Sequence, residues 1–270
     1  MTTDPPRTFA AVTTCHRAGY EAYGRAMLES FDRHWPDSVS LLLYAEEFTP
    51  EAVGPRVHVR DLHVSCPELL AFKQRHADDP RAHGSGDRPR WALRLEWSPF
   101  KLKLRRKRSI GYRWDAVRFS HKVFALSHAA RLLPADVLIL LDADLLFVAD
   151  LPAALLEGLV PRDGFVGYLA RPKFSECGFV AYNLRHPATA SFIEEFEGLY
   201  TSDRLFRHLQ WHDSYLFDVV RGRFERRGCR SYDVAEGAGR RNGQVLAASR
   251  LAPYMQHRKG PGKCSPRSLA

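Results

Sequence analysis

An α/β fold is predicted because apolar runs typical of buried strands alternate with segments of helical periodicity. Residues 9–14 and 39–44 are the first two such runs, and the amphipathic segment 20–35 separates them. A strand, a helix and a second strand in that order imply a parallel sheet. Of the 270 residues, 45% are hydrophobic, which is enough to bury the core of one domain spanning 1–270.

The middle of the chain contains the strongest strand signal. Residues 119–133 have the spacing of a helix, Pro134 ends it, and 137–141 form a continuous apolar run. Such a run is expected of a central strand that is covered on both faces. Further elements are expected as strands at 164–169 and 178–183, and as helices at 188–200 and 213–220.

Two segments show no regular pattern. Residues 78–87 are rich in Asp, Gly and Ser, which predicts an exposed loop. The tail from Glu236 onward is rich in Gly, Arg and Lys. We expect irregular structure there that folds back on the sheet and adds little to the core.

Asp142 and Asp144 directly follow the apolar run at 137–141. In open α/β sheets, ligands bind at the C-terminal ends of the strands. Two carboxylates beside a buried strand repel each other unless a cation neutralises them. Hard oxygen ligands of this kind suit Mg²⁺ or Mn²⁺, which then bridge a diphosphate. The alternative is a strand end at which the aspartates cap the next turn.

A short segment near the C-terminus, 257–263, combines a histidine, glycines and cations. His257 would complete the metal shell with a nitrogen ligand, which favours Mn²⁺ over Mg²⁺. Gly260 lets the backbone approach a phosphate closely, and Lys263 would supply positive charge to a departing diphosphate. The alternative is a disordered basic tail.

The formal net charge of +9 favours anionic partners such as nucleotide phosphates or anionic lipid headgroups. Residues 101–108 hold six of the Lys and Arg side chains. This basic segment is either a solvated loop or helix face, or a peripheral contact with an anionic membrane. No nucleic acid partner is expected.

The five cysteines include no Cys-x-x-Cys pair, which predicts reduced thiols rather than disulfides or a structural zinc site. No apolar stretch reaches the roughly 18 residues of a membrane span, and the N-terminus lacks the apolar core of a signal peptide. We therefore expect a cytoplasmic protein, peripheral at the inner face of the membrane if the basic segment makes contact.

The order and spacing of these motifs resemble a known family. An Asp-x-Asp after an apolar strand, with a late His-x-x-Gly-x-x-Lys, is similar to the retaining glycosyltransferases related to glycogenin and to bacterial lipopolysaccharide galactosyltransferases. The likeness extends to 9–31, 119–144 and 176–184. These look like the family's opening strand and helix, its helix leading to the metal motif, and its strand that ends in Asn-Leu.

The resemblance implies a GT-A fold, a UDP-sugar donor and Mn²⁺ (or Mg²⁺), with 1–144 mainly binding the nucleotide-sugar and 145–270 mainly serving the acceptor and the C-terminal clamp over the donor. The residues that match the family's metal ligands are Asp142, Asp144 and His257. The residues matched to nucleotide-sugar binding are Thr13, Thr14, Tyr20, Lys122, Asp142, Ala143, Gly260 and Lys263. The acceptor is an unidentified glycan, lipid-linked or small molecule.

His212 and Asp213 match the pair that lies beside the reacting sugar, with His212 in place of the family's glutamine. As the bond to the diphosphate breaks, the sugar becomes oxocarbenium-like. Asp213 is the carboxylate best placed to stabilise it or to orient the acceptor hydroxyl. Glu176 is a second catalytic candidate, and with Cys177 it replaces the family's Asn-Ala. The alternative role for Asp213 is a helix N-cap.

Two other classes of protein compete with this reading. A haloacid dehalogenase-type phosphohydrolase also places Asp-x-Asp after an apolar strand, with the first aspartate as nucleophile. That motif opens the chain, whereas here it lies at mid-sequence. A non-enzymatic polyanion-binding domain would explain the positive charge but not the strand that leads into two aspartates.

The charge density of residues 101–108 predicts binding to anionic vesicles at low salt. Each cation near such a surface contributes about 1 kcal/mol, so replacing Arg105 and Arg106 with Gln should weaken sedimentation with phosphatidylserine vesicles. Added salt should weaken it further. Phosphatidylcholine vesicles are the control. If the wild-type chain does not bind anionic vesicles at low salt, the membrane contact is wrong and the segment is a solvated loop or helix face.

Overall fold

The fold is described by a computed structural model over residues 5–51, 53–85, 89–90, 107–108, 111–238 and 244–258. Most of the basic segment lies outside these residues, as do Gly260 and Lys263. Of that segment only the backbone of β5 (Lys107–Arg108) is described, and it pairs with β4 (Pro89–Arg90). The proposals for the basic segment and for the phosphate-binding loop therefore stay predictions.

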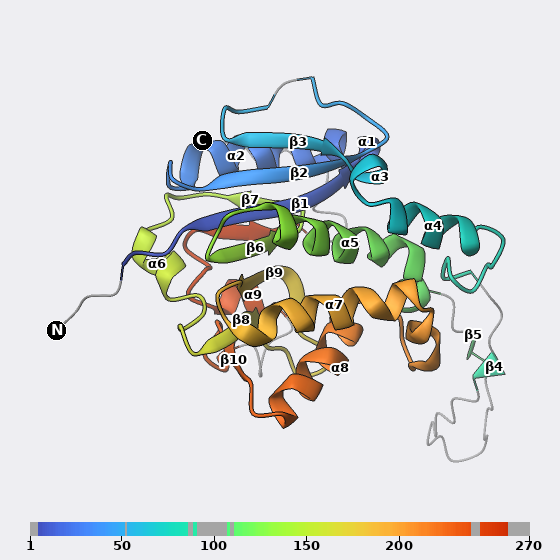
Figure 1. The fold of residues 1–270 in the computed structure, drawn as a ribbon. Coiled ribbons are helices and arrows are strands. Elements are labelled where there is room, and N and C mark those ends of the chain that lie inside the picture. The colour runs from blue at the N-terminus through green and yellow to red at the C-terminus, as the bar shows by residue number, and fades with distance from the viewer. Residues whose placement is uncertain are drawn as a thin grey trace, which may run out of the picture.

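The centre of the fold is a seven-stranded sheet with the strand order β10-β8-β9-β6-β1-β2-β3 (Figure 1). Its strands are β1 (Phe9–His16), β2 (Ser40–Glu46), β3 (Val57–Asp61), β6 (Val137–Leu141), β8 (Gly164–Leu169), β9 (Glu176–Asn183) and β10 (Arg230–Asp233). Two short strands, β7 (Leu145–Phe147) and β11 (Met255–His257), pair separately. The predicted α/β class, with a central sheet flanked by helices, is confirmed.

The sheet is mixed, whereas the sequence pattern predicted a parallel one. β1 is parallel to β2 and β6, and β2 is parallel to β3, but β9 is antiparallel to both β6 and β8. The reason is the short connection from β8 to β9, residues 170–175, because a parallel pair needs a crossover of a dozen or more residues. This reversal brings the start of β9, at Glu176, to the edge where β1, β2 and β6 end.

Helices cover both faces of the sheet. The longer ones are α2 (Arg25–His34), α4 (Pro67–Arg75), α5 (Ala116–Leu132), α7 (Pro187–Thr201) and α8 (Asp213–Arg226). The shorter ones are α1 (Arg17–Gly19), the π-helix η1 (Tyr20–Gly24), α3 (Leu62–Ser65), η2 (Tyr112–Trp114), α6 (Ala153–Glu157), η3 (Arg204–Arg207) and α9 (Val245–Ala248). In Figure 1, α5 and α7 lie side by side across the sheet.

The strands divide their side chains between two hydrophobic cores, one on each face. In β6, Leu138 and Leu140 belong to the core that α5, α7 and α8 cover. Val137, Ile139 and Leu141 belong to the core that α2 covers. All five are at most 3% exposed, as expected of a central strand. Each such side chain stabilises the fold by about 1.5–3 kcal/mol when buried. The core therefore holds the end of β6 firmly, and with it the start of the segment that follows.

The start of α8 corrects one reading of Asp213. The N-cap of this helix is His212, whose Nδ1 accepts a hydrogen bond from the Tyr215 amide at 3.3 Å. Asp213 is the first helical residue, so its reading as the N-cap is wrong. Its carboxylate instead accepts hydrogen bonds from Lys122 and from the Ser214 amide.

The residues predicted to form an exposed loop at 78–87 are buried in part. Ala82 is fully buried in the core under α5, and its carbonyl accepts a hydrogen bond from the Val117 amide at 3.1 Å. One apolar residue within a polar run carries no periodicity. Its burial is therefore decided by the docking of this segment on α5.

The tail folds back on the sheet as expected, but it does so as regular structure. β11 pairs in antiparallel fashion with β7, and Met255 is only 1% exposed within the second core. Val245 and Leu246 of α9 belong to the same core. The expectation that the tail adds little to the core is therefore wrong for 244–258. Elements of three or four residues are too short to show a periodicity in the sequence.

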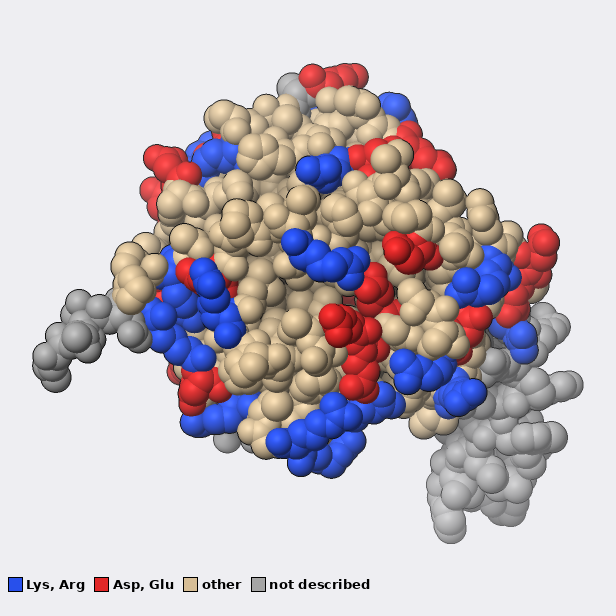
Figure 2. Space-filling model, in the orientation of Figure 1, with Lys and Arg blue, Asp and Glu red and all other residues tan. Residues whose placement is uncertain are grey.

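Charged side chains of both signs are interspersed on the face shown in Figure 2. Basic side chains form several separate groups there, with acidic side chains between them. Among the described residues on this face, the basic side chains therefore do not form a single patch. Over the part of the chain that is described, no helix has the length and apolarity that a bilayer span requires.

Gly167 in β8 tests the packing of the sheet, because a Cβ there would lie 2.1 Å from the Leu159 carbonyl oxygen. Gly167→Ala should shift backbone and lower the free energy of unfolding by about 1–3 kcal/mol. Gly222→Ala is the control: inside α8, its Cβ would meet only the Arg226 guanidinium, at 3.5 Å. It should stabilise by up to about 1 kcal/mol. Equal effects in urea denaturation would contradict this account.

Candidate active site

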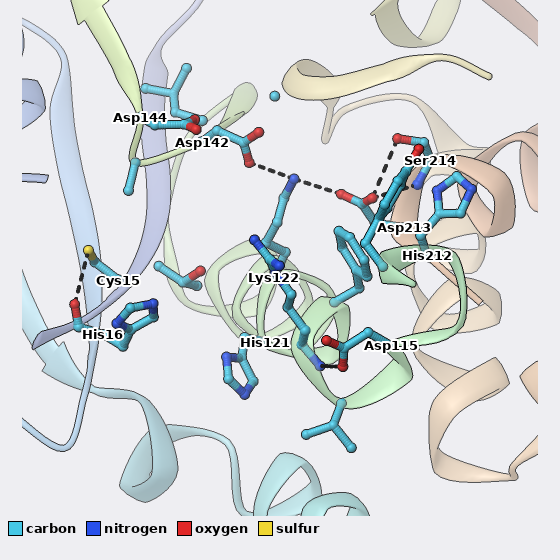
Figure 3. A pocket seen from close by; sticks show the side chains of 18 of the residues that line it. Cys15, His16, Asp115, His121, Lys122, Asp142, Asp144, His212, Asp213 and Ser214 are labelled. Atoms are coloured by element: carbon cyan, nitrogen blue, oxygen red, sulfur yellow. Dashed lines mark hydrogen bonds and ion pairs between the residues drawn. The ribbon is translucent and has the colours of Figure 1, made fainter. Parts of the chain in front are cut away.

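The candidate site is a cavity of about 1190 Å³ at the edge of the sheet where β1, β2 and β6 end. This is the edge at which open α/β sheets bind ligands. Its walls come from these strand ends and from β9, α5, the start of α8 and β11 (Figure 3). The lining includes Thr14, Cys15, His16, Glu46, Lys122, Asp142, Ala143, Asp144, Glu176, Gly178, His212, Asp213, Ser214 and His257.

Three side chains that can ligate a metal converge on one wall of this cavity. Asp142, Glu176 and His257 each offer a ligand atom, and these atoms all lie within 4.8 Å of one another. The distance from His257 Nε2 to Asp142 Oδ2 is 3.5 Å, and from His257 Nδ1 to Glu176 Oε1 it is 4.0 Å. Two oxygens and one nitrogen in this span suit a divalent cation. Glu176, singled out in the sequence as a catalytic candidate, thus lies among the groups that could hold a metal.

Asp144, the second aspartate of the motif, also contacts the imidazole of His257. Its Oδ1 lies 2.9 Å from His257 Nε2. Its backbone carbonyl accepts a hydrogen bond from the Arg258 amide at 2.9 Å, and the β7–β11 register places His257 opposite Leu145. Backbone and side-chain contacts therefore hold the tail against Asp144, whose part in metal binding stays a prediction.

Gly178 in β9 leaves the space in which these groups meet. A Cβ at this position would lie 2.6 Å from His257 Cε1 and 2.8 Å from Asp142 Oδ2. Both distances are shorter than any tolerable van der Waals contact. A residue with a side chain would force the imidazole and the carboxylate apart, so glycine here is a condition for the close approach of the tail.

Lys122 of α5 lies between two carboxylates (Figure 3). Its Nζ is 2.7 Å from Asp142 Oδ1 and 2.7 Å from Asp213 Oδ2, and it donates to the Cys177 carbonyl at 3.0 Å. Its side chain is 16% exposed. Burial alone would lower the pKa of Lys122, but the two carboxylates outweigh it and hold the pKa well above its usual value. Lys122 is therefore a permanent cation inside the cavity.

The same contacts give the two aspartates different acidities. Burial would raise the pKa of Asp213, but Lys122 outweighs burial and holds this pKa below its usual value. Burial also raises the pKa of Asp142, and there Lys122 and His257 offset it only in part. Asp213 is therefore ionised at neutral pH. Asp142 lies in a region where further positive charge would stabilise its ionised form.

Glu176 is held in place by two further contacts. Its Oε2 lies 3.1 Å from Arg171 Nη1, and its Oε1 accepts a hydrogen bond from the Gly178 amide at 3.2 Å. With this pair included, the corner has four carboxylates and two permanent cations. The carboxylates belong to Asp142, Asp144, Glu176 and Asp213, and the cations to Lys122 and Arg171. The excess of negative charge favours a divalent cation.

Of the residues matched to nucleotide-sugar binding, four line the cavity: Thr14, Lys122, Asp142 and Ala143. Thr13 and Tyr20 are not among its lining residues, and they are only 1% and 4% exposed. The Thr13 hydroxyl donates a hydrogen bond to the Leu141 carbonyl at 2.9 Å, so it is engaged by the neighbouring strand, whereas Thr14 lies one residue nearer the end of β1 that opens into the cavity. Tyr23, one helical turn after Tyr20, lines the cavity instead.

Sequence reasoning missed a polar group at the β2 side of the cavity. Glu46, at the end of β2, lies 2.6 Å from Lys73 Nζ and 3.4 Å from His121 Nδ1. Burial lowers the pKa of His121 to about 4, so this imidazole is neutral near pH 7. Three separate elements supply the group, and it therefore has no spacing in the sequence that could have revealed it.

Sequence reasoning also missed a group of aromatic side chains, Tyr112, Phe119 and Phe174, which we call the aromatic wall. All three line the cavity, and their rings lie around the imidazole of His212. They come from η2, from α5 and from the loop between β8 and β9. No pattern of hydrophobic residues predicts that three such positions will meet.

No family model matches the chain, and no curated protein matches it. Solved structures do match. Mouse xyloside xylosyltransferase 1 is 13% identical, with 83% of this chain and 84% of that chain covered and a TM-score of 0.48. The glycosyltransferase GlyE of Streptococcus pneumoniae TIGR4 is 13% identical, with 80% and 43% covered and a TM-score of 0.43.

The bifunctional glycosyltransferase WbbM is also 13% identical, with 96% of this chain and 47% of that chain covered and a TM-score of 0.49. The match thus spans less than half the length of the GlyE and WbbM chains. At this identity and with every TM-score below 0.5, these likenesses assign no residue and no activity. The function of the chain has to be argued from the chemistry of its own cavity.

Lys122→Met should be strongly destabilising because it leaves the buried carboxylate of Asp213 and the half-buried carboxylate of Asp142 without their cation. Breaking such a buried pair costs about 3–5 kcal/mol. Arg25→Met is the matched control, since Arg25 and Glu51 form a pair with side chains 52% and 83% exposed. It should change stability by no more than about 1 kcal/mol. The free energy of unfolding in urea measures both.

A double variant separates lost charge from lost packing. Asp213→Asn removes one of the carboxylates that Lys122 neutralises, so the Lys122→Met/Asp213→Asn protein should recover part of the stability that Lys122→Met loses. If the two substitutions instead add their costs independently, Lys122 acts through packing and not as a bridging cation.

Proposed function

We propose that this chain is a metal-dependent glycosyltransferase that moves a sugar from a nucleotide-sugar donor to an acceptor. The proposal rests on one observation. A single cavity contains a set of residues that could hold a metal and, beside it, a carboxylate that stays ionised. Asp142, Glu176 and His257 form the first, and Asp213 is the second. Lys122 lies between them, in contact with both Asp142 and Asp213.

The donor set suits the metal that the proposal needs. Carboxylate oxygens and one imidazole nitrogen are ligands for Mn²⁺, and oxygen ligands also accept Mg²⁺. We assign Asp142, Asp144 and His257 to the metal, with Glu176 as a further ligand. When bound, the ion would neutralise the donor's diphosphate and the negative charge that develops on it as the sugar leaves.

Lys122 would help the protein to bind the diphosphate of the donor. Its ammonium group is a permanent cation close to Asp142, so with a divalent cation bound it would add to the positive charge that faces the phosphate oxygens. Thr14 and Ala143 line the adjoining wall, where we assign the nucleoside. The assignments of Gly260 and Lys263 to the diphosphate fall outside the described residues and remain predictions.

Asp213 is the residue we assign to the reacting sugar. Positive charge develops on the anomeric carbon as its bond to the diphosphate oxygen breaks, and a preorganised carboxylate stabilises that charge. Lys122 and the Ser214 amide hold the carboxylate in place. Asp213 therefore needs no rearrangement when the bond breaks. Retention of configuration and UDP as the nucleotide are parts of the proposal that rest on the family resemblance.

The size of the cavity is consistent with two substrates. Sites for drug-sized ligands typically span about 300–1,000 Å³, and this cavity is about 1190 Å³. A nucleotide-sugar would fill the part between the ends of β1 and β6 and the metal corner. Space then remains beside His212 for an acceptor.

Nucleotide binding should depend on the metal. We expect UDP to raise the unfolding temperature by several degrees in the presence of Mn²⁺, because a ligand at about one hundred times its Kd stabilises the native state by about 2.7 kcal/mol. EDTA should abolish the shift, and sugar transfer should cease with it. An equal shift in EDTA, or full activity without metal, would overturn the metal dependence.

Carboxylate variants identify the ligands. Asp142→Asn, Asp144→Asn and Glu176→Gln should each weaken Mn²⁺ binding at least about tenfold, as measured by electron paramagnetic resonance of the unbound ion. Glu51→Gln, with a side chain 83% exposed and far in sequence from the motif, is the control. A Glu176→Gln protein that binds Mn²⁺ like the wild type would remove Glu176 from the ligand set but leave the other two in place.

A further inference from the structure

The aromatic wall, Tyr112, Phe119 and Phe174, surrounds the imidazole of His212 at the α8 side of the cavity. The distances from the His212 ring centroid to the three ring centroids are 5.9, 6.1 and 5.0 Å respectively. His212 is only 4% exposed, whereas Tyr112 is 57% exposed and the two phenylalanines are half-buried. The wall therefore still presents aromatic surface to a ligand.

Each ring is packed against a cationic side chain. Lys173 lies 5.6 Å over Phe174, Arg113 lies 6.0 Å over Tyr112, and Arg118 lies 5.9 Å over Phe119. Phe174 also packs at 5.6 Å against Tyr215 of α8. Aromatic side chains with such partners lose little further freedom when a ligand arrives.

The wall lies on the opposite side of Lys122 from the strand ends that we assign to the nucleoside. In Figure 3, Cys15 and His16 of β1 lie on one side of Lys122, and His212, Asp213 and Ser214 lie on the other. A base at the end of β1 would therefore stay on the far side of the donor from His212. The aromatic wall is next to the carboxylate that faces the reacting sugar, where the second substrate must bind.

The chemistry of this wall selects a class of ligand. A pyranose ring has an apolar C–H face, which packs on aromatic faces, and a rim of hydroxyl groups. The groups next to the wall are polar: His212 Nε2 bonds to Gln210 Oε1 at 3.2 Å, and the Asp213 carboxylate and the Ser214 hydroxyl also line the cavity. A lipid chain would match the rings but would offer no hydrogen-bonding group to the polar side chains that border them, whereas the hydroxyl groups of a sugar would.

We propose that the aromatic wall is the acceptor subsite and that the acceptor group it takes is a sugar. The inference rests on the proposed function and names the acceptor class for the same cavity. The C–H face of the acceptor ring packs against Tyr112 and Phe174, and one hydroxyl points toward Asp213. That hydroxyl oxygen forms the new bond to the anomeric carbon, the bond from that carbon to the diphosphate oxygen breaks, and the hydroxyl proton leaves with the diphosphate.

Ring-deleting and ring-retaining variants test the subsite. Tyr112→Ala and Phe174→Ala are compared with Tyr112→Phe and Phe174→Tyr. Leu209→Ala removes another exposed apolar side chain, 66% exposed and not part of the cavity lining, as the matched control. Binding of a panel of methyl glycosides, in the presence of UDP and Mn²⁺, is measured by saturation-transfer difference NMR. The KM values for donor and acceptor are measured with the glycosides that bind.

We expect at least one glycoside to bind. Loss of either ring should weaken its affinity and raise its KM about threefold to tenfold, while the donor KM changes less. Tyr112→Phe and Phe174→Tyr should recover most of this loss, and Leu209→Ala should behave like the wild type. If donor and acceptor KM instead rise together, and the ring-retaining variants do not recover, the wall is a structural element and the proposal fails.

The experiment distinguishes a failure of the sugar subsite from a failure of the proposed glycosyltransferase function. A panel in which no glycoside binds, while a prenyl phosphate in detergent micelles does, overturns the sugar subsite but leaves the glycosyltransferase standing. A protein that releases UDP from no UDP-sugar, yet binds glycosides in a manner that Tyr112→Ala and Phe174→Ala weaken, retains the subsite and loses the proposed function.

Discussion

The ammonium group of Lys122 is the contact on which the rest of the cavity depends. It joins the end of β6 to the start of α8 through Asp142 and Asp213, each at 2.7 Å. The carboxyl group of Asp213 is buried and that of Asp142 is half-buried. A buried charge without a partner is one of the most unfavourable features that a fold can contain. One side chain of α5 thus fixes the position of two carboxylates that lie far apart in the chain. It also outweighs the effect of burial on Asp213 and holds the pKa of this carboxyl group below its usual value.

The topology of the sheet builds the other half of the site. Because β9 runs antiparallel to β6, its first residues, at Glu176, reach the edge where Asp142 lies. β11 then adds His257 by pairing with β7 directly after Asp144. Gly178 makes the meeting sterically feasible, since any Cβ there would clash with both His257 and Asp142. A carboxylate-rich corner of this kind is stable only with positive charge nearby, so its architecture and its proposed affinity for a divalent cation have one electrostatic cause.

The cavity is divided by charge and by surface chemistry. Anionic side chains dominate the corner around His257, Lys122 lies in the middle, and aromatic rings surround His212 at the other end. Such a gradient from a carboxylate-rich corner to an aromatic surface suits the proposed function, in which the donor is charged at one end and the acceptor is not. Asp213 lies where the two regions meet. This position favours Asp213 over Glu176 as the carboxylate proposed to act on the reacting sugar, because Glu176 is engaged by Arg171 beside the groups that could hold a metal.

Local patterns in the sequence determined the class of the fold and one end of the site. The apolar run 137–141 became β6 with those bounds, and the acidic residues after it line the cavity, because both features depend on neighbours in the chain. Only the tertiary structure decided the direction of β9, the strand in the tail, and the meeting of Glu176, Lys122 and the aromatic rings with the acidic motif. Those features arise from packing between segments separated by tens of residues. Periodicity is a local property, and it carries no information on which distant side chains will share one pocket.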